Sequence, residues 1–146
     1  PHLAARDVSF VAISRARLEH LNAFKRRMGW NFRWVSSFAS DFNFDYHVSF
    51  TPEDKKRNRG YYNYREDEYQ HDELPGLSVF CKDDGGQVFH TYSSYARGNE
   101  EVIGAFIYFD MTPKGRNETQ IMDWVKRNDE YAQSKNASCC HPGGKA

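Results

Sequence analysis

The chain has 146 residues, in which 20 Lys and Arg balance 20 Asp and Glu to a formal net charge of zero. That balance argues against a nucleic-acid-binding protein, whose phosphate contacts need an excess of basic residues. No apolar run approaches the roughly 18 residues of a membrane span. Three Trp, nine Tyr and eleven Phe are enough for an aromatic core, so we expect one α/β domain over residues 1–133. Residues 134–146 have the composition of a flexible tail.

The first part of the chain is typical of a strand–helix–strand unit. Residues 8–13 form a short apolar run, which predicts a strand buried on both faces. Apolar residues then recur at helical spacing from Leu18 to Met28, and Gly29 is a suitable C-cap. A second short strand is expected over residues 32–38, and the helix between the two strands predicts that they run parallel.

The middle of the chain carries two less regular patterns. Residues 41–50 alternate between polar and apolar side chains, which predicts a strand, although a compact loop could use the same residues. Residues 51–74 contain a basic cluster, four tyrosines and an acidic cluster. The simplest interpretation of residues 51–74 is a solvated excursion whose charges neutralise each other. The alternative is a lid or dimer arm anchored by its tyrosines.

The second half of the chain predicts a hairpin, a strand and a helix. Residues 77–82 and 87–95 flank the turn sequence DDGG at 83–86, which is a strong hairpin signal. The apolar run over residues 102–109 predicts a further strand. A final helix is expected to begin at Asn117, which can serve as its N-cap.

No residue pattern identifies a metal site. Asp41, Asn43 and Asp45 have the opening rhythm of a calcium loop, but Tyr46 stands where such a loop needs glycine. The six histidines lack the spacing of a zinc site built within one segment. His90 is expected to be an ordinary strand histidine rather than an acid–base group. We therefore expect no metal and no cofactor.

Cysteine usage fits a reducing compartment, so we expect a cytoplasmic protein. The chain has three cysteines and no C-x-x-C pair. Cys81 is expected to be a buried, inert thiol within a strand, and Cys139 and Cys140 lie in the tail. As written, the chain lacks a dithiol catalyst.

Several strings of residues are together specific to one family. They are RDV at 6–8, SRA at 14–16, RMGW at 27–30, WVSS at 34–37, SDFN at 40–43, PGLSVF at 75–80, FHTYSSYARG at 89–98 and TPKGR at 112–116. Over roughly residues 3–131 the chain resembles an uncharacterised, mostly bacterial family. That family is a domain of unknown function with a thioredoxin-like fold, often labelled a predicted dithiol–disulfide oxidoreductase. The chain is similar, more distantly, to the peroxiredoxins in its order of strand, helix, short strand, loop and hairpin.

The resemblance implies an α/β fold in which a thioredoxin-like mixed sheet is flanked by helices. In members of that family a first strand and a Cys-containing turn precede the segment equivalent to residues 2–3. The resemblance therefore assigns the catalytic thiols to no residue of this chain, and the fold would lack its first strand and Cys-bearing helix. We expect the apolar face left uncovered either to form a homodimer contact or to lower stability.

Four residues are candidates for lining a cleft. Pro75 precedes a strand where the thioredoxin fold keeps a cis-proline, and the alternative is a simple strand-start proline. Trp34 and Tyr92 are candidates for the walls. Arg97 is a candidate for a fixed positive charge that holds a thiolate or an anionic substrate. The structural alternatives are a core position for Trp34, a strand face for Tyr92 and a salt-bridged surface position for Arg97.

Two functions from different classes follow. The first is a thiol–disulfide oxidoreductase acting on a protein disulfide or a small thiol or peroxide, with this chain inactive by itself. The second is a thioredoxin-like binding or scaffold module without redox chemistry, which the absent dithiol and the aromatic, charged residues 51–74 favour. Neither function involves nucleic acid or a membrane.

Overall fold

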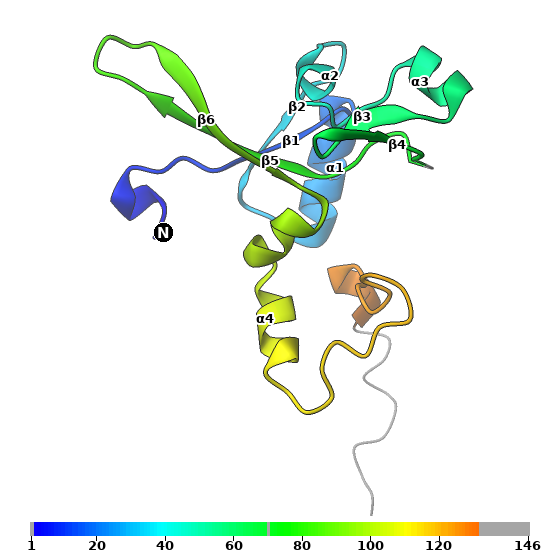
Figure 1. Cartoon of the computed structure of the whole chain (residues 1–146). Coiled ribbons are helices and arrows are strands. Elements are labelled where there is room, and N and C mark those ends of the chain that lie inside the picture. Colours follow the sequence, from blue (N-terminus) through cyan, green and yellow to red (C-terminus); the bar gives the residue numbers. More distant parts are fainter. Residues whose placement is uncertain (1, 70, 132–146) are drawn as a thin grey trace, which may run out of the picture.

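The chain is a mixed α/β structure whose strands form separate two-stranded sheets. The computed structural model describes residues 2–69 and 71–131. Within these residues the strands pair in chain order: the first with the second, the third with the fourth and the fifth with the sixth (Figure 1). The described residues thus do not form the single mixed sheet that the resemblance implies. The tail predicted over 134–146, with Cys139 and Cys140, lies outside them.

The strand–helix–strand unit predicted near the start of the chain is confirmed. β1 (Val11–Ser14) pairs in parallel with β2 (Arg33–Ser36), and α1 (Leu18–Met28) connects them. α1 ends at Gly29, whose φ of 67° is the left-handed conformation expected of a C-cap. One expectation was wrong: β1 is not buried on both faces, because Ile13 keeps 38% of its surface exposed.

Residues 41–50 do not form the predicted strand, because they begin as a short helix. α2 (Phe42–Asp45) brings the rings of Phe42 and Tyr46 together one helical turn apart, with centroids separated by 4.7 Å. The positive φ of 52° at His47 then ends the helical path. The alternation of polar and apolar residues in the sequence therefore does not mark a strand here, because two of its aromatic side chains pack against each other at helical spacing.

Residues 51–74 are folded into a helix and a hairpin. α3 (Pro52–Arg57) begins with a capping box at Thr51. β3 (Gly60–Tyr62) and β4 (Arg65–Asp67) follow as an antiparallel pair. The segment is therefore not structureless. Most of its residues are nevertheless exposed, and Lys55 of the basic cluster pairs with Asp72 of the acidic cluster, as the simplest interpretation expects.

The tyrosines of this segment anchor it to buried aromatic residues. Tyr62 is 3% exposed and packs with Phe50 and Tyr95. Tyr69 stacks on the ring of Phe50, with centroids separated by 5.2 Å. Gly60 lies so close to Phe50 that a Cβ atom built there would overlap the ring. Anchoring is therefore confirmed for Tyr62 and Tyr69, whereas Tyr61 and Tyr64 are 43% and 67% exposed. A role as a lid or dimer arm stays a prediction.

The predicted hairpin is confirmed. β5 (Gly76–Lys82) pairs antiparallel with β6 (Val88–Tyr95), and the turn at 83–86 joins them. The Asp83 carboxylate accepts a hydrogen bond from the Gln87 N–H at 2.8 Å, which fixes the turn. The turn end of the hairpin projects from the rest of the described chain (Figure 1).

A β-bulge interrupts β6. Val79 pairs with Tyr92 while Phe80 pairs with His90, so Thr91 is an extra residue on β6. Such an insertion bends the strand that carries it and leaves the opposite strand regular. The bulge therefore distorts β6 and not β5.

Residues 102–109, predicted as a strand, form the end of a 3-10 helix and a short α-helix. η2 (Ala96–Val102) leads into α4 (Gly104–Asp110). Phe106 is 2% exposed whereas Tyr108 is 72% exposed, so α4 buries one side only. A short, unbroken apolar run fits a strand and a helix equally well, which is why the sequence pattern misled.

The final helix predicted from Asn117 is absent from the described residues. Asn117 and Met122 have φ values of 49° and 62°, which an α-helix does not allow. The Thr119 N–H donates to the Asp123 carboxylate and the Met122 N–H donates to the Glu118 carboxylate. Side chains thus take the backbone hydrogen bonds that a helix would have used.

The segment after α4 is held by ion pairs and one tryptophan. The Arg116 guanidinium donates two hydrogen bonds to the Asp110 carboxylate, at 2.8 and 2.7 Å. The ring of Trp124 packs edge-on against two rings of α4. Arg27 and Asp129, whose Nε and Oδ2 are 2.6 Å apart, tie this segment to α1 (Figure 1).

Few large apolar residues of the described part are buried. They are Leu21, Met28, Phe50, Tyr62, Tyr95 and Phe106. A short 3-10 helix before β1, η1 (Ala4–Arg6), buries none of its residues, and Phe10 beside it is 57% exposed. Large exposed apolar surface in a folded chain is typical of surfaces that contact something else.

Candidate functional site

Pro75 lies directly before β5, where Tyr62 holds the backbone. The Tyr62 hydroxyl donates to the Pro75 carbonyl oxygen at 2.6 Å and accepts from the Ala96 N–H at 2.8 Å. Burial raises the pKa of the Tyr62 hydroxyl, so this group stays a neutral donor. The Leu74–Pro75 peptide bond is trans. The position therefore has the geometry of a strand-start proline and lacks the cis bond that the resemblance implies.

Trp34 belongs to an aromatic cluster between β2 and α1. Its indole N–H donates to the Ser14 hydroxyl at 3.0 Å. The rings of Phe24, Trp30 and Phe32 surround it, with centroids 5.6 to 6.1 Å away. The indole is part-buried, its polar atom has a partner, and its ring is packed, which fits the structural alternative for this residue.

Tyr92 lies on an uncovered face of the β5–β6 hairpin. It is 52% exposed and stands opposite Val79. Cys81 and Phe89 are also opposite each other, and strand alternation places them on the same face. Cys81 is exposed, and its Sγ is 3.9 Å from the Lys82 carbonyl oxygen. The expectation of a buried thiol was therefore wrong, and Val79 and Phe89 on the same face are exposed as well.

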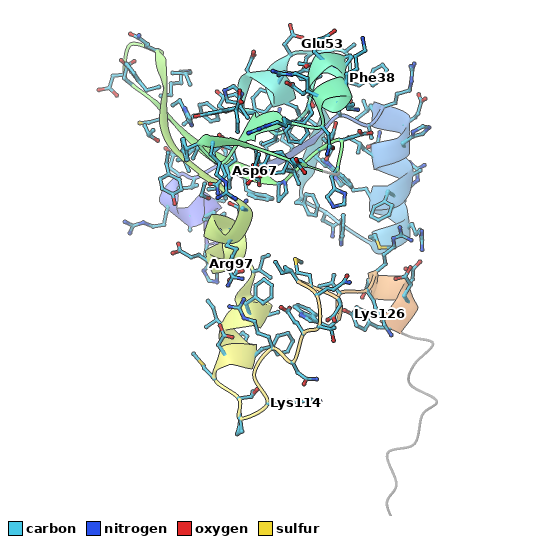
Figure 2. The ribbon with its side chains drawn as sticks, turned by 45° about the vertical axis from the view of Figure 1, so that its right-hand side comes forward. Phe38, Glu53, Asp67, Arg97, Lys114 and Lys126 are labelled. Atoms are coloured by element: carbon cyan, nitrogen blue, oxygen red, sulfur yellow. The ribbon has the colours of Figure 1, made fainter. Side chains whose placement is uncertain are left out.

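Arg97 lies on η2, beneath the hairpin (Figure 2). Its side chain is 69% exposed, and its guanidinium is 3.3 Å from the Glu100 carboxylate. The same carboxylate accepts a hydrogen bond from Arg116 at 2.9 Å. This arrangement is the salt-bridged surface group that the sequence analysis gave as the alternative.

The described residues show no shared cleft for the four candidates. Trp34 packs between β2 and α1, Tyr92 lies on the open face of the hairpin, and Arg97 pairs within η2. Pro75 is connected to the region of Arg97 through Tyr62, whose hydroxyl bridges Pro75 and the residue before Arg97. A binding or catalytic role for the four residues stays a prediction.

A hollow beside α3 was not foreseen from the sequence. It has a volume of about 210 Å³, and its lining includes the stacked rings of Phe50 and Tyr69. Lys55 and Asp72 also line it and form an ion pair, with Nζ and Oδ1 2.6 Å apart. The hydrogen bond from Lys55 holds the pKa of the Asp72 carboxyl below its usual value. The opposite charge runs of residues 51–74 were the available signal, but only the folded hairpin brings them together.

Three polar side chains on the hairpin form a hydrogen-bonded row in which a serine lies as close to a histidine as a nucleophile lies to its base. His90 Nε2 is 2.8 Å from the Ser93 hydroxyl, which is 3.1 Å from the Ser78 hydroxyl. The same Nε2 is 2.9 Å from the Tyr92 carbonyl oxygen. The Nε2 atom thus faces both a hydroxyl and a carbonyl oxygen, and whether it donates or accepts depends on the tautomer of the ring. The three side chains form a cross-strand hydrogen-bonded contact between β5 and β6.

The segment with a calcium-like rhythm is used for folding. Asn43 is buried in α2, and its side-chain oxygen accepts a hydrogen bond from the Ser37 hydroxyl at 2.6 Å. Throughout the described residues, no three His, Cys, Asp or Glu side chains are grouped so that they could hold a metal ion. The described part of the chain also has no helix with the length and apolar character needed to cross a bilayer.

Comparison with known proteins identifies a family whose model covers all of the described residues. A family model described as "Bacterial protein of unknown function (DUF899)" matches residues 1–131. No curated protein and no solved structure matches the chain.

Proposed function

The chain belongs to the bacterial protein family of unknown function DUF899, and we propose that it forms the thioredoxin-like part of a thiol–disulfide oxidoreductase. The main support is the order of its elements. A parallel β1–α1–β2 unit is followed by the antiparallel β5–β6 hairpin. Thioredoxin-like folds combine such a unit and such a hairpin in this order. Since one fold serves many functions, the reaction itself has to be tested.

The chemistry proposed for the working protein is thiolate attack. A thiolate attacks one sulfur of a disulfide, a mixed disulfide forms, and the second sulfur leaves as a thiolate. With a peroxide, the attacked oxygen is transferred to the thiolate as a sulfenate, and the other oxygen leaves as water or an alcohol. Among the described residues Cys81 is the one free cysteine. The proposal therefore assigns the described residues to the scaffold and substrate surface rather than to the attack.

We assign supporting roles to the four candidate residues. Pro75 would shape the cleft, and its fixed position through Tyr62 supports this role. Trp34 and Tyr92 would form walls, with the exposed ring of Tyr92 available to a protein disulfide substrate. Arg97, with its largely exposed guanidinium, would hold a thiolate or an anionic substrate.

The proposal also requires that exposed apolar side chains near β1 and on the β5–β6 hairpin are covered in the working protein. Phe10, Val79 and Phe89 are 57%, 44% and 45% exposed. Side chains of this size are usually covered by another element or by a second subunit. Cover by a second copy would make the protein a homodimer. A reducing cytoplasm is the proposed compartment, because Cys81 is a free thiol.

The test is reduction of insulin disulfides with dithiothreitol, using the full protein purified from its natural source. We expect a rate above that of dithiothreitol alone. The Cys81→Ser variant should keep this rate, because the proposal gives Cys81 no part in the attack. A protein that gives no enhancement, or one that loses it in Cys81→Ser, would contradict the proposal.

The second candidate is a binding or scaffold module without redox chemistry. The observation that favours it is the hollow beside α3, where aromatic rings and a neutralised ion pair form a surface without a thiol. The same assay separates the two functions. Absence of any enhancement by the full protein leaves the binding module as the better explanation.

A further inference from the structure

A second hollow lies at the C-terminal end of α1. It is open to solvent and has a volume of about 430 Å³, a size that suits a small molecule. Its lining residues are Asn22, Lys25, Arg26, Gly29, Trp30 and Asn31. The first four of them follow the spacing i, i+3, i+4 and i+7, which places them on one face of the helix and its cap.

The hollow is lined by two cations, Lys25 and Arg26, that form no ion pair within the described residues. None of its lining residues is acidic. Among the ion pairs of the described residues, Asp129 neutralises Arg27, but none involves Lys25 or Arg26. The hollow beside α3 differs in this respect, because Lys55 is paired there.

Backbone N–H groups, and not the side chains of Lys25 and Arg26, cap this end of the helix. The Gly29 N–H donates to the carbonyl oxygens of Arg26 and Lys25, and the Trp30 N–H donates to the Lys25 carbonyl oxygen at 3.0 Å. The carbonyl groups of Lys25 and Arg26 thus have backbone partners. The helix dipole favours cations here, but it leaves the donors of the ammonium and guanidinium groups available to a ligand.

Trp30 supplies a flat surface whose position is set before binding. Its ring centroid lies 5.5 Å from that of Phe24, 5.2 Å from that of Phe32 and 5.6 Å from that of Trp34. These contacts restrain the ring, which remains 39% exposed. Gly29, which precedes Trp30, has open space where a side chain would stand. A restrained aromatic surface lowers the entropic cost of binding a planar ligand.

We propose that this hollow binds a small anion that carries a planar aromatic ring. The ring stacks on Trp30, the anionic group lies between Lys25 and Arg26, and the amides of Asn22 and Asn31 hydrogen-bond to polar substituents. An aromatic carboxylate and a nucleoside phosphate share this chemistry. The inference goes beyond the proposed oxidoreductase and does not depend on it, since no thiol takes part.

The test is calorimetric titration of the chain with adenosine monophosphate, with benzoate and with inorganic phosphate. We expect saturable binding of at least one ring-bearing anion and weaker binding of phosphate. Tighter binding of adenosine monophosphate would identify the ligand as a nucleotide, and tighter binding of benzoate would identify it as an aromatic carboxylate. Lack of saturable binding of both ring-bearing anions at ~10 mM ligand, a limit that corresponds to a very weak complex, would overturn the proposal.

Three variants locate the site. Lys25→Gln and Arg26→Gln should each weaken binding of the ring-bearing anion about threefold, the effect of losing one exposed ion pair. Trp30→Leu should weaken it while leaving binding of inorganic phosphate unchanged. Lys25→Gln and Arg26→Gln alter exposed side chains, so their result stands even if Trp30→Leu disturbs the aromatic cluster.

The matched control is Lys56→Gln, the same change on α3, where the side chain is exposed. This variant should bind like the unchanged chain. If Lys56→Gln weakens binding as much as Lys25→Gln does, the anion responds to overall charge and the proposed site is wrong.

Discussion

The bridge made by the Tyr62 hydroxyl provides a sharp test of how the parts of the chain are joined. This hydroxyl on β3 connects the carbonyl group of Pro75, before β5, to the N–H of Ala96, after β6. Tyr62→Phe removes the oxygen and keeps the ring in its contacts with Phe50 and Tyr95. The change therefore isolates the two hydrogen bonds from the packing of the side chain.

The expected loss follows from those two hydrogen bonds. Each is worth about 0.5–1.5 kcal/mol net, so Tyr62→Phe should lower the free energy of unfolding by about 1–3 kcal/mol. For a chain of this length, each kcal/mol shifts the thermal midpoint by roughly 3 °C. We therefore expect a midpoint lower by roughly 3–9 °C.

Urea and thermal unfolding followed by circular dichroism measure this loss, with Tyr64→Phe as the control. Tyr64 undergoes the same chemical change two residues away, but it is 67% exposed and its hydroxyl is 3.4 Å from the Ser93 carbonyl oxygen. That contact is worth little, so Tyr64→Phe should leave the midpoint nearly unchanged. Equal midpoints for the two variants would refute the idea that Tyr62 joins the hairpins.

The pH dependence gives a second readout for Tyr62. Burial raises the pKa of its hydroxyl above the ordinary value of 10.0, so the folded state favours the neutral form. This stabilisation is complete below pH 10.0 and is lost as the pH rises through the raised pKa. The stability difference between the unchanged chain and Tyr62→Phe should therefore shrink at high pH. A difference that stays constant would contradict the assigned role.

Three further predictions concern packing, charge and assembly. Gly60→Ala should lower the urea midpoint because the added Cβ overlaps the Phe50 ring, whereas Gly104→Ala, whose Cβ would meet nothing within 4 Å, should not; equal midpoints would contradict the close approach. The hydrogen bonds from Arg116 hold the pKa of Asp110 below 3.8. Their stabilisation is therefore present above that value and is lost as the pH falls through the lowered pKa. Asp110→Asn should flatten this acid dependence in thermal melts, and an unchanged pH profile would argue against the pair. The chain should sediment as a dimer, because its exposed apolar side chains favour cover by a second copy, and a monomer would argue against this cover.

Elements with local signals could be predicted from the sequence. The helical spacing from Leu18 to Met28 and the glycine cap that follows are both local, and α1 has these bounds. The DDGG turn likewise specifies the hairpin within a few residues. In each case the deciding interactions join residues that are close in the chain.

Short aromatic runs could not be assigned, because their partners are distant in sequence. The run at 102–109 became helical where Phe106 packs against Trp124, well beyond the window in which periodicity is read. Residues 41–50 contain apolar side chains at both strand and helical spacing, and folding selected the helical contacts. The hollow beside α3 depends on Lys55 meeting Asp72, which only the β3–β4 turn brings about.

The hollow at the end of α1 is different, because the sequence held its signal. Its four helix-face residues are spaced at i, i+3, i+4 and i+7, and two of them are basic. That pattern is typical of an ordinary solvated helix face. This face differs from an ordinary one because the Gly29 cap places Trp30 beside it.

The extra residue Thr91 makes the two outer edges of the hairpin unequal as templates for aggregation. A bulged edge does not offer evenly spaced N–H and C=O groups to an incoming strand. The outer edge of β5 is regular, unpaired in the described residues, and bears Lys82 as its one charged residue. Concentrated solutions of the chain should therefore polymerise through β5 rather than β6. Replacing Val79 with a charged residue would oppose this strand pairing and keep the protein in solution.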